Sequence, residues 1–478
     1  MKFPVLSRWV CAPALALTSL LGSSASQGED YFQHQRQLIR HGVEAVLACN
    51  GLYTSDRTLA QVRAQELAYL VRFQADTVPG ELQVHREQQA VTVAAPTGDQ
   101  AIHAAFRPGI GCVVLAPEQT LADIGTLPQL DLPPPAGNPA DLPWPMGDAI
   151  PEQPIPDSID GAALQAASDW AFQRETPEQD TISLLVLYRG QIIHERYAPG
   201  FDMHTRTRTW STAKSIAVSL IGQLVAAGKL KLDEPLNLPF GPQLEAGVDP
   251  RADITLRHLL NMSSGLYPVD SFNKEYATGS GLAYWAGASS VKGALDRGLV
   301  RAPGSFWDYE NYDTLLAVLA MKQVLGEQAY REYPRRALLD KLGMRNTLVS
   351  TDRFGDFILS SQVYTNARDL ARFGQLYLQQ GEWQGEQLLP REWIDFVRHP
   401  APATAGSGNF YGGQWWLVPD ERKGEVPADA YSTAGNRGQF VIVVPSHDLV
   451  IVRRGLDYGA QGFDRWDLAR EVIKAVRH

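Results

Sequence analysis

The chain has 478 residues, which is more than one typical core holds, so we expect two folded units. Its hydrophobic content of 44% and charged content of 20% are typical of a soluble globular protein. A formal net charge of −10, without a basic stripe, argues against a nucleic-acid partner. The ten histidines and three cysteines show no metal-ligand spacing, so we expect neither a metal site nor a cofactor.

The first 26 residues are predicted to be a secretory signal peptide. Lys2 and Arg8 give it a positive start, residues 11–21 form a short apolar run, and small residues at 23–26 offer a cleavage site. The run is too short to anchor the chain in a bilayer, and no later segment resembles a membrane span. We therefore expect a periplasmic or secreted protein without stable membrane insertion.

Residues 27–125 are predicted to form a small α/β accessory domain. Helical patterns at 31–47 and 59–73 are followed by short strand patterns. Cys49 and Cys112 are the two cysteines that remain after the signal, and in an oxidising compartment we expect them to pair. Two unpaired buried cysteines are the alternative.

Residues 126–160 are rich in proline, and we expect a stiff, extended linker that Trp144 could anchor to a domain. Residues 161–478 then mix helical and strand patterns. Hairpins are predicted at 182–197 and 438–453, near the two ends of this region, with helices between them and a last helix after them. This order predicts one sheet assembled from distant segments.

Ser211 and Lys214 lie at the start of a long apolar run. Residues three apart on a helix share a face, with about 5–6 Å between Cβ atoms, so the lysine can reach the serine hydroxyl. Serine and lysine are a known nucleophile and base pair, and backbone N–H groups at a helix start favour developing negative charge. The alternative is a helix-capping serine followed by an ordinary lysine. The same spacing at 271–274 and 289–292 lies in polar stretches that we interpret as loops.

Tyr309 and Asn311 form a Tyr-x-Asn motif after a Pro-Gly turn and before a predicted helix. A lysine cation beside a tyrosine would favour loss of the phenolic proton. Taken alone, such a tyrosine is more often a packed aromatic side chain. The Tyr-x-Asn at 364–366 lacks the Pro-Gly turn, and we interpret it as a coincidence.

Together these motifs resemble the β-lactamase-related serine hydrolases, a group that includes class C β-lactamases, DD-peptidases, esterases and 6-aminohexanoate-dimer (nylon oligomer) hydrolases. The resemblance runs from about residue 180 to 475, and its last segments look most like the nylon-oligomer-hydrolase and esterase branch. It implies an α+β fold, with an antiparallel sheet flanked by helices and a helical subdomain. The supporting segments besides the motifs above are 254–266, 361–378, 413–417 and 434–440.

The resemblance also implies roles for single residues. Ser211 would be the acylated nucleophile and Lys214 its proton partner. Tyr309 would be the acid/base toward the leaving group and the deacylating water. Backbone N–H groups of Ser211 and Gln439 would form the oxyanion hole, and Asn311 would help to position the substrate. Whether Lys214 or Tyr309 is the acylation base is left open.

The third motif departs from the Lys-Thr-Gly of β-lactamases, because the matching positions read Asn436-Arg437-Gly438. These three are candidate substrate-binding residues, with Gly438 allowing a close approach of the backbone to the substrate and Arg437 alternatively a solvent-facing strand residue. Strand alternation would put Asn436 and Arg437 on opposite faces. Without the lysine, recognition of a lactam carboxylate is in doubt, and neutral substrates are favoured.

We therefore expect a hydrolase that cleaves a small-molecule ester or amide through an acyl-enzyme. One alternative is a β-lactamase or DD-peptidase acting on cell-wall-like substrates. The other is a non-catalytic binding or sensor protein, which the intact set of Ser211, Lys214 and Tyr309 disfavours, because such a protein needs none of the three.

Overall fold

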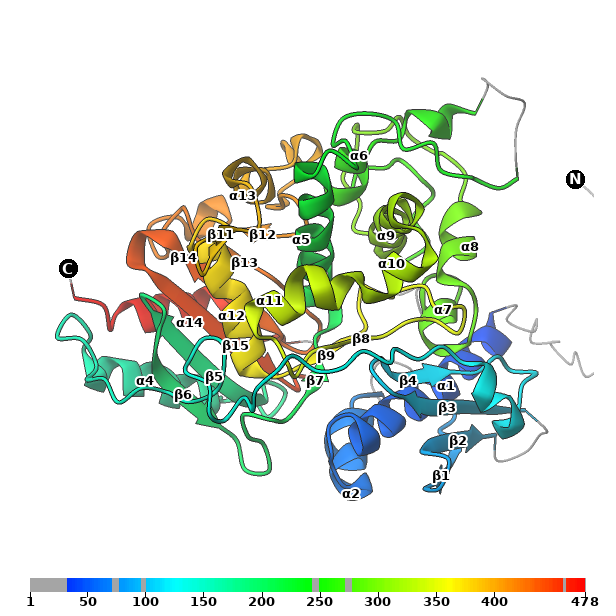
Figure 1. Cartoon of the computed structure of the whole chain (residues 1–478), viewed down its shortest axis with the longest axis horizontal. Helices are drawn as coiled ribbons and strands as arrows, with labels where there is room; N and C mark the ends of the chain where they lie inside the picture. Colours follow the sequence, from blue (N-terminus) through cyan, green and yellow to red (C-terminus); the bar gives the residue numbers. More distant parts are fainter. Residues whose placement is uncertain are drawn as a thin grey trace, which may run out of the picture.

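The protein is described by a computed structural model, which places a small N-terminal unit against a larger mixed body (Figure 1). The predicted signal peptide and the motif at 271–274 lie outside the described residues. In the described part of the chain, no helix is both long enough and apolar enough to cross a membrane. The described residues are 32–70, 77–95, 100–242, 249–270, 277–458 and 461–477.

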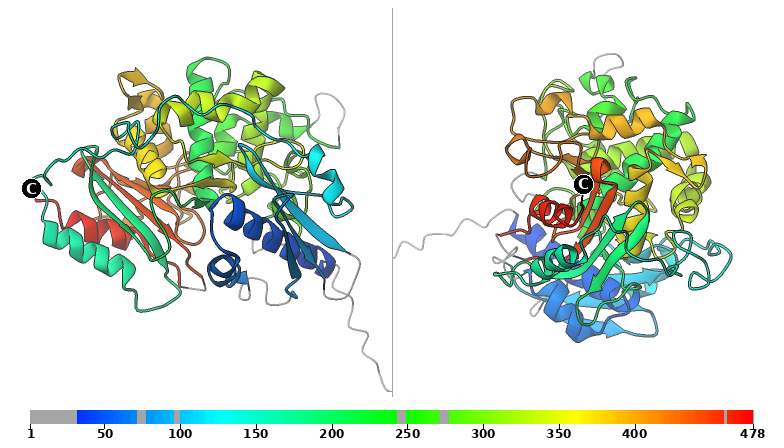
Figure 2. Two further views of the ribbon diagram at one scale, coloured as in Figure 1. Left: turned by 60° about the horizontal axis from the view of Figure 1, so that its bottom comes forward. Right: turned by 90° about the vertical axis from the view of Figure 1, so that its left-hand side faces the viewer.

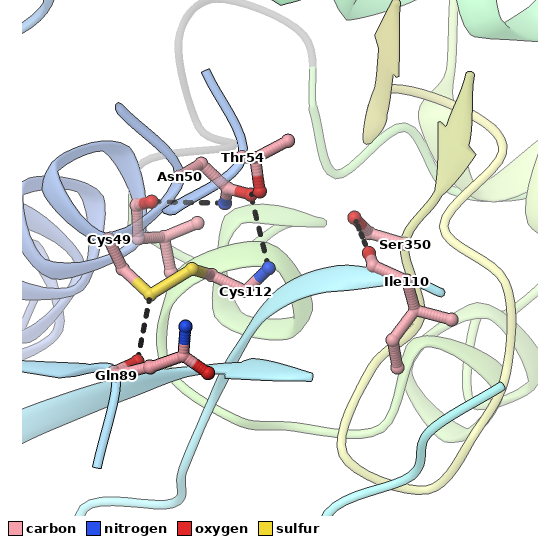
Figure 3. Close-up of a disulfide and its surroundings, with 8 residues drawn as sticks. Cys49, Asn50, Thr54, Gln89, Ile110, Cys112 and Ser350 are labelled. Carbon is pink, nitrogen blue, oxygen red and sulfur yellow. Dashed lines mark hydrogen bonds between the residues drawn. A yellow bond between two sulfur atoms is a disulfide. The ribbon is translucent and has the colours of Figure 1, made fainter. Parts of the chain in front are cut away.

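The N-terminal unit is a helix packed on a four-stranded antiparallel sheet of order β1-β2-β3-β4. The pairing of Cys49 with Cys112 is confirmed: the disulfide joins α1 to β4, with 6.0 Å between the Cα atoms (Figure 3). Closing a loop of 63 residues stabilises the fold by about 4 kcal/mol on the chain-entropy model. The elements are α1 (Gln33–Tyr53), α2 (Leu59–Gln61), η1 (Val62–Leu67), β1 (Glu81–His85), β2 (Ala90–Ala94), β3 (Ala101–Arg107) and β4 (Gly111–Val114).

This unit shares its hydrophobic core with the larger body. Helix α1 crosses α7 (Gly281–Trp285) so closely that a Cβ on Gly42 would lie 1.7 Å from the carbonyl oxygen of Trp285. Ser350 of the larger body donates a 2.6 Å hydrogen bond to the carbonyl oxygen of Ile110 (Figure 3). The two units are therefore joined by close packing as well as by the chain between them.

The proline-rich stretch 126–160 lies along the larger body. Its carbonyl groups accept hydrogen bonds of 2.6–3.0 Å from the guanidinium groups of Arg345 and Arg372. The indole Nε1 of Trp144 donates to the carbonyl oxygen of Gly190 at 2.9 Å. The stretch is thus a fixed strap on the surface.

The larger body is built on a six-stranded antiparallel sheet of order β12-β13-β14-β15-β5-β6. Ile451 of β15 pairs with Val186 of β5, so strands from the two ends of this region meet, as the sequence predicted. The strands are β5 (Thr181–Tyr188), β6 (Gln191–Tyr197), β12 (Trp416–Leu417), β13 (Tyr431–Ser432), β14 (Phe440–Val444) and β15 (Leu449–Gly455).

Helices cover both faces of this sheet, which is why β5 is buried along its whole length. Alternate residues of β5 point to opposite faces. Leu184 and Val186 pack under α4 (Gly161–Phe172) and α14 (Arg465–Ile473), which lie side by side in Figure 2. Leu185 and Leu187 pack under α12 (Ala367–Leu378).

A helical subdomain completes the body around the buried helix α5 (Ala213–Ala226) (Figure 1). The motif at 289–292, predicted as a loop, instead begins a helix, because Ser289 accepts a 3.1 Å hydrogen bond from the N–H of Lys292. The remaining elements are α6 (Leu256–Leu260), α8 (Ser290–Leu295), α9 (Asn311–Leu325), α10 (Glu327–Tyr333), η6 (Pro334–Leu339), α11 (Asp340–Leu342), α13 (Arg391–Arg398), β7 (Thr207–Arg208), β8 (Leu348–Val349), β9 (Val363–Thr365), β10 (Glu382–Trp383) and β11 (Glu386–Gln387).

Candidate active site

Ser211 lies in the short turn between β7 and α5, on the rim of a pocket. The preceding residue, Trp210, has φ +50, which is strained for a bulky side chain. Its ring is fixed by Trp285, with 6.3 Å between ring centroids, and by the edge of Tyr69 at 6.2 Å. Packing on this tryptophan therefore sets the turn that presents the serine.

Lys214 is buried one turn into the helix, and its side chain points back to Ser211. Its Nζ lies 3.3 Å from the Oγ of Ser211, 2.6 Å from the Oδ1 of Asn311 and 2.8 Å from the carbonyl oxygen of Ser360. An ammonium group has three N–H donors, and these contacts give each one an acceptor. The structure thus brings the predicted nucleophile and its proton partner together, with the lysine held from two other sides.

Tyr309 lies beside the same lysine, as its proposed role requires. Its ring centroid is 4.9 Å from the Nζ of Lys214. Three aromatic rings surround it, those of Trp307, Tyr411 and Trp416, with centroids 5.7–6.3 Å away. Tyr309 also lines the pocket with Ser211, so both side chains face the same space.

Asn311 does not match its predicted role as a substrate contact. It is buried at the start of α9, and its Oδ1 accepts from Lys214 while its Nδ2 donates to the Oγ of Ser280 at 3.0 Å. Its amide is directed at the lysine, and it is absent from the residues that line the pocket. We correct its role to holding Lys214.

Glu310, the middle residue of the Tyr-x-Asn motif, is buried next to the site and was missed by the sequence analysis. Burial and the charge of Asp270 raise the pKa of Glu310 well above its usual range, and Arg297 opposes this shift. The protonated carboxyl group is therefore favoured at neutral pH. No signal in the sequence separates this residue from an exposed glutamate before a helix.

The pocket has a volume of about 360 Å³ and lies between the nucleophile turn, the aromatic rings and the sheet edge. Its size suits a small molecule. It is lined by Ser211, Tyr309, Trp416, Ala434, Gly435, Asn436, Arg437, Gly438, Phe440, Asp457, Tyr458, Gly462, Phe463 and Arg465.

The third motif is a turn, and this changes the predicted role of Arg437. Residues 436–438 form a turn closed by a bridge between Gly435 and Gln439, so the expected strand alternation does not apply. Asn436 is exposed at the pocket. Arg437 has φ +60, and its guanidinium is buried against the carboxylate of Glu66 at 2.9 Å. The arginine is thus neither a solvent-facing strand residue nor directed at a substrate.

The predicted oxyanion donor at this motif needs correction, and its glycines have roles that the sequence did not show. The backbone N–H of Gln439 donates to the carbonyl oxygen of Gly435 at 3.1 Å, so it is not free to bind an oxyanion. Gly438, at φ +78, makes room for an ion pair, because a Cβ there would lie 1.8 Å from the Nη1 of Arg453. Gly435 makes a close backbone approach within the protein, where a Cβ would lie 2.1 Å from the carbonyl oxygen of Thr209, two residues before Ser211.

Arg465, the first residue of α14, brings a cation into the pocket that the sequence analysis did not identify. Burial lowers the pKa of Arg465 to about 10, so the group remains charged at neutral pH. Its guanidinium lies 5.5 Å from the ring of Trp416 and 5.1 Å from that of Trp466. Within the described ranges no carboxylate forms an ion pair with it, and its Nε has no hydrogen-bond partner.

Comparison with known proteins agrees with this geometry. The model of the Beta-lactamase family matches residues 172–454, which is more than half of the chain. The chain therefore belongs to that family. A 6-aminohexanoate-dimer hydrolase of Paenarthrobacter ureafaciens is 25% identical over 304 residues, which cover 59% of this chain and 74% of that protein. An uncharacterized protein of Alkalihalophilus pseudofirmus is 24% identical over 300 residues, 59% of this chain and 86% of that protein.

Solved structures show the same fold. The octameric penicillin-binding protein homologue from Pyrococcus abyssi matches with a TM-score of 0.50 at 18% identity, over 66% of this chain and 77% of that one. EstCE1, a hydrolase with promiscuous acyltransferase activity, matches with a TM-score of 0.50 at 19% identity, over 66% of this chain and 97% of that one. The predicted resemblance and fold class are therefore confirmed, and the chain is a hydrolase of the beta-lactamase fold.

Proposed function

We propose that this chain is a serine hydrolase that cleaves ester or amide bonds through an acyl-enzyme on Ser211. The observation that carries the proposal is the contact of 3.3 Å between the Nζ of Lys214 and the Oγ of Ser211, beside Tyr309, which lines the same pocket as Ser211. Such a contact lets the serine proton leave as the oxygen attacks a carbonyl carbon. A binding protein would not need this arrangement.

In the proposed mechanism, the Oγ of Ser211 bonds to the carbonyl carbon, and its proton passes to Lys214 in its neutral amine form or to Tyr309 in its phenolate form. The proton then goes to the leaving alcohol or amine as the acyl-enzyme forms. Water attacks the acyl carbon, gives a proton back through the same groups, and frees the serine. The N–H of Ser211 and an N–H of the pocket-lining stretch 434–438 would stabilise the oxyanion, since the N–H of Gln439 is occupied.

We further propose that preferred substrates carry a carboxylate. The loss of the lysine in the third motif favoured neutral substrates, but Arg465 supplies a cation in the same pocket. Guanidinium groups bind carboxylates through charged hydrogen bonds. The dimer of 6-aminohexanoate, for which one relative is named, is an amide with a free carboxylate. A β-lactam also carries one, so Arg465 keeps the β-lactamase or DD-peptidase alternative as a second candidate.

A substrate screen tests the reaction class. We expect the purified protein to hydrolyse p-nitrophenyl esters and short linear amides with a terminal carboxylate. A chromogenic cephalosporin should be turned over more slowly, because no lysine stands in the third motif and the cation of Arg465 enters the pocket from a different element, α14. Cephalosporin turnover that exceeds both would favour the β-lactamase candidate, and no turnover of any substrate would contradict the proposed function.

Arg465→Met should reduce kcat/KM for a carboxylate-bearing p-nitrophenyl ester and leave the neutral ester of equal length unchanged. A charged hydrogen bond is worth about 1.5–3 kcal/mol, which corresponds to roughly ten- to hundredfold in kcat/KM. Arg470→Met is the matched control, because Arg470 is on the same helix but pairs with Glu425 and Glu471 away from the pocket. An equal loss of kcat/KM for both esters would show that Arg465 supports the packing of the pocket and does not bind the carboxylate.

We also propose that the enzyme works outside the cytoplasm. The Cys49–Cys112 disulfide supports this location, since such bonds persist in oxidising compartments.

A further inference from the structure

The N-terminal unit contacts the active site directly, although it contributes no residue to the proposed chemistry. Its segment 65–69 lies behind the pocket turn 436–438 and beside the residue before the nucleophile. The contact to the turn passes through the guanidinium of Arg437, and the contact to the nucleophile passes through the ring of Tyr69.

The Arg437 guanidinium ties the pocket turn to its surroundings with four hydrogen bonds. Its Nη1 donates to the carboxylate of Glu66 at 2.9 Å and its Nη2 to the carbonyl oxygen of Gln65 at 2.6 Å. Its Nη2 and Nε also donate to the carbonyl oxygens of Leu456 and Asp457, at 2.9 and 3.1 Å. Because the backbone of Arg437 is at φ +60, these side-chain bonds support a strained turn.

Glu66 is the charged centre of this junction. Its two carboxylate oxygens accept from two buried guanidinium groups, Oε1 from Arg57 at 2.7 Å and Oε2 from Arg437 at 2.9 Å. Removal of one partner from a buried ion pair leaves an uncompensated charge, which neighbouring segments must move to solvate. Here the neighbouring segment is the turn that lines the pocket.

Tyr69 extends the junction to the other side of the site. The Arg437 guanidinium lies 4.4 Å from the Tyr69 ring centroid, and the edge of that ring packs on Trp210, the residue before Ser211. One short N-terminal segment therefore touches both the nucleophile turn and the turn from which we expect an oxyanion donor. Small displacements of such groups lower rates, because the reacting atoms must be aligned.

We propose that Glu66 is a positioning residue of the active site, which acts through Arg437 on the pocket turn 436–438 and makes the N-terminal unit an integral part of the catalytic site. This inference rests on the proposed function. It assigns to residues 65–69 a role in turnover that a separate accessory domain would not have.

The test compares two buried carboxylates of the same unit in the full mature chain. Glu66→Gln should lower kcat/KM for a p-nitrophenyl ester by roughly ten- to hundredfold, mainly through kcat. Glu44→Gln is the matched control, because Glu44 forms a buried ion pair with Arg40 at 2.8 Å, accepts its other hydrogen bond from the N–H of Gly80, and does not line the pocket. It should lower the free energy of unfolding and leave kcat and KM at the wild-type values.

A kinetic double-mutant cycle shows whether the effect passes through Arg437. Arg437→Met should lower kcat as Glu66→Gln does, and the double variant should be no slower than Arg437→Met alone. If the Glu66→Gln variant does not fold, the Tyr69→Leu variant is used in its place. Tyr69→Leu keeps both ion pairs of Glu66 and removes the ring between Arg437 and Trp210. This variant should also have a lower kcat.

Wild-type kinetics in Glu66→Gln or Tyr69→Leu, additive effects in the cycle, or equal losses in Glu66→Gln and Glu44→Gln would each overturn the inference while the wild-type enzyme stays active. An inactive wild-type protein would instead overturn the proposed function and this inference with it.

Discussion

Ser211→Ala is expected to abolish covalent labelling by a fluorophosphonate and to lower ester turnover to near background. Alanine removes the only atom that can form the acyl-enzyme, while the pocket and its N–H donors stay in place. Loss of a serine nucleophile in a hydrolase typically costs on the order of 10⁶-fold in kcat. Peptide mass spectrometry of the labelled wild-type protein should find one modified residue, in the peptide that contains Ser211.

Ser289→Ala is the matched control for this experiment. Ser289 precedes Lys292 with the same spacing, but its side chain caps α8 by accepting from the N–H of that lysine at 3.1 Å. Its loss should cost about 1 kcal/mol of stability and leave labelling unchanged. Label that persists in Ser211→Ala, or that is lost in Ser289→Ala, would contradict the assignment of the nucleophile.

The contact between Ser211 and Lys214 could be predicted from the sequence because its geometry is local. Ser211 and Lys214 are three residues apart, and the apolar run behind them predicts a buried helix start, so helix geometry alone brings the side chains together. The disulfide could also be predicted, because only Cys49 and Cys112 remain after the predicted signal peptide. The assembly of one sheet from distant segments followed from the strand patterns at both ends of the region.

Features that depend on distant contacts could not be predicted. Arg437 was expected on a strand, but its partner Glu66 is 371 residues away, and nothing in the sequence pairs the two. Arg465 has the appearance of an exposed arginine on a terminal helix, and only the packing of α14 on a face of the sheet puts it in the pocket. The predicted accessory domain shares its core with the hydrolase body through contacts such as Gly42 on Trp285, which have no local pattern.

The roles of the glycines and the donors of the oxyanion hole could not be predicted from the sequence for a related reason. The motif comparison identified a short sequence, Asn436-Arg437-Gly438, but not the chain path through it. A turn closed by Gly435 and Gln439 packs Gly435 against the carbonyl oxygen of Thr209 and occupies the N–H of Gln439. The family resemblance therefore predicted which segment lies at the site, while the assignment of single backbone groups required the structure.

Lys214→Ala and Tyr309→Phe should each lower kcat by roughly 10³-fold or more, and the double variant should be little slower than the slower single variant. The reason is their shared role: Lys214 lies 3.3 Å from the Oγ of Ser211 and 4.9 Å from the Tyr309 ring centroid, so the two groups handle one proton path. Loss of either group interrupts that path, and loss of the second then removes nothing further. The measurement is kcat for an ester and for an amide in all four proteins, with folding checked by circular dichroism.

Tyr411→Phe is the control that separates proton transfer from ring packing. Tyr411 is fully buried against Tyr309, with 6.1 Å between ring centroids, and does not line the pocket. The Tyr411→Phe variant should keep the wild-type turnover, because the ring that supports Tyr309 remains and only the hydroxyl is removed. Near-wild-type turnover in Tyr309→Phe would reduce Tyr309 to the same packing role as Tyr411. Multiplicative losses in the double variant would show that Lys214 and Tyr309 act in separate steps.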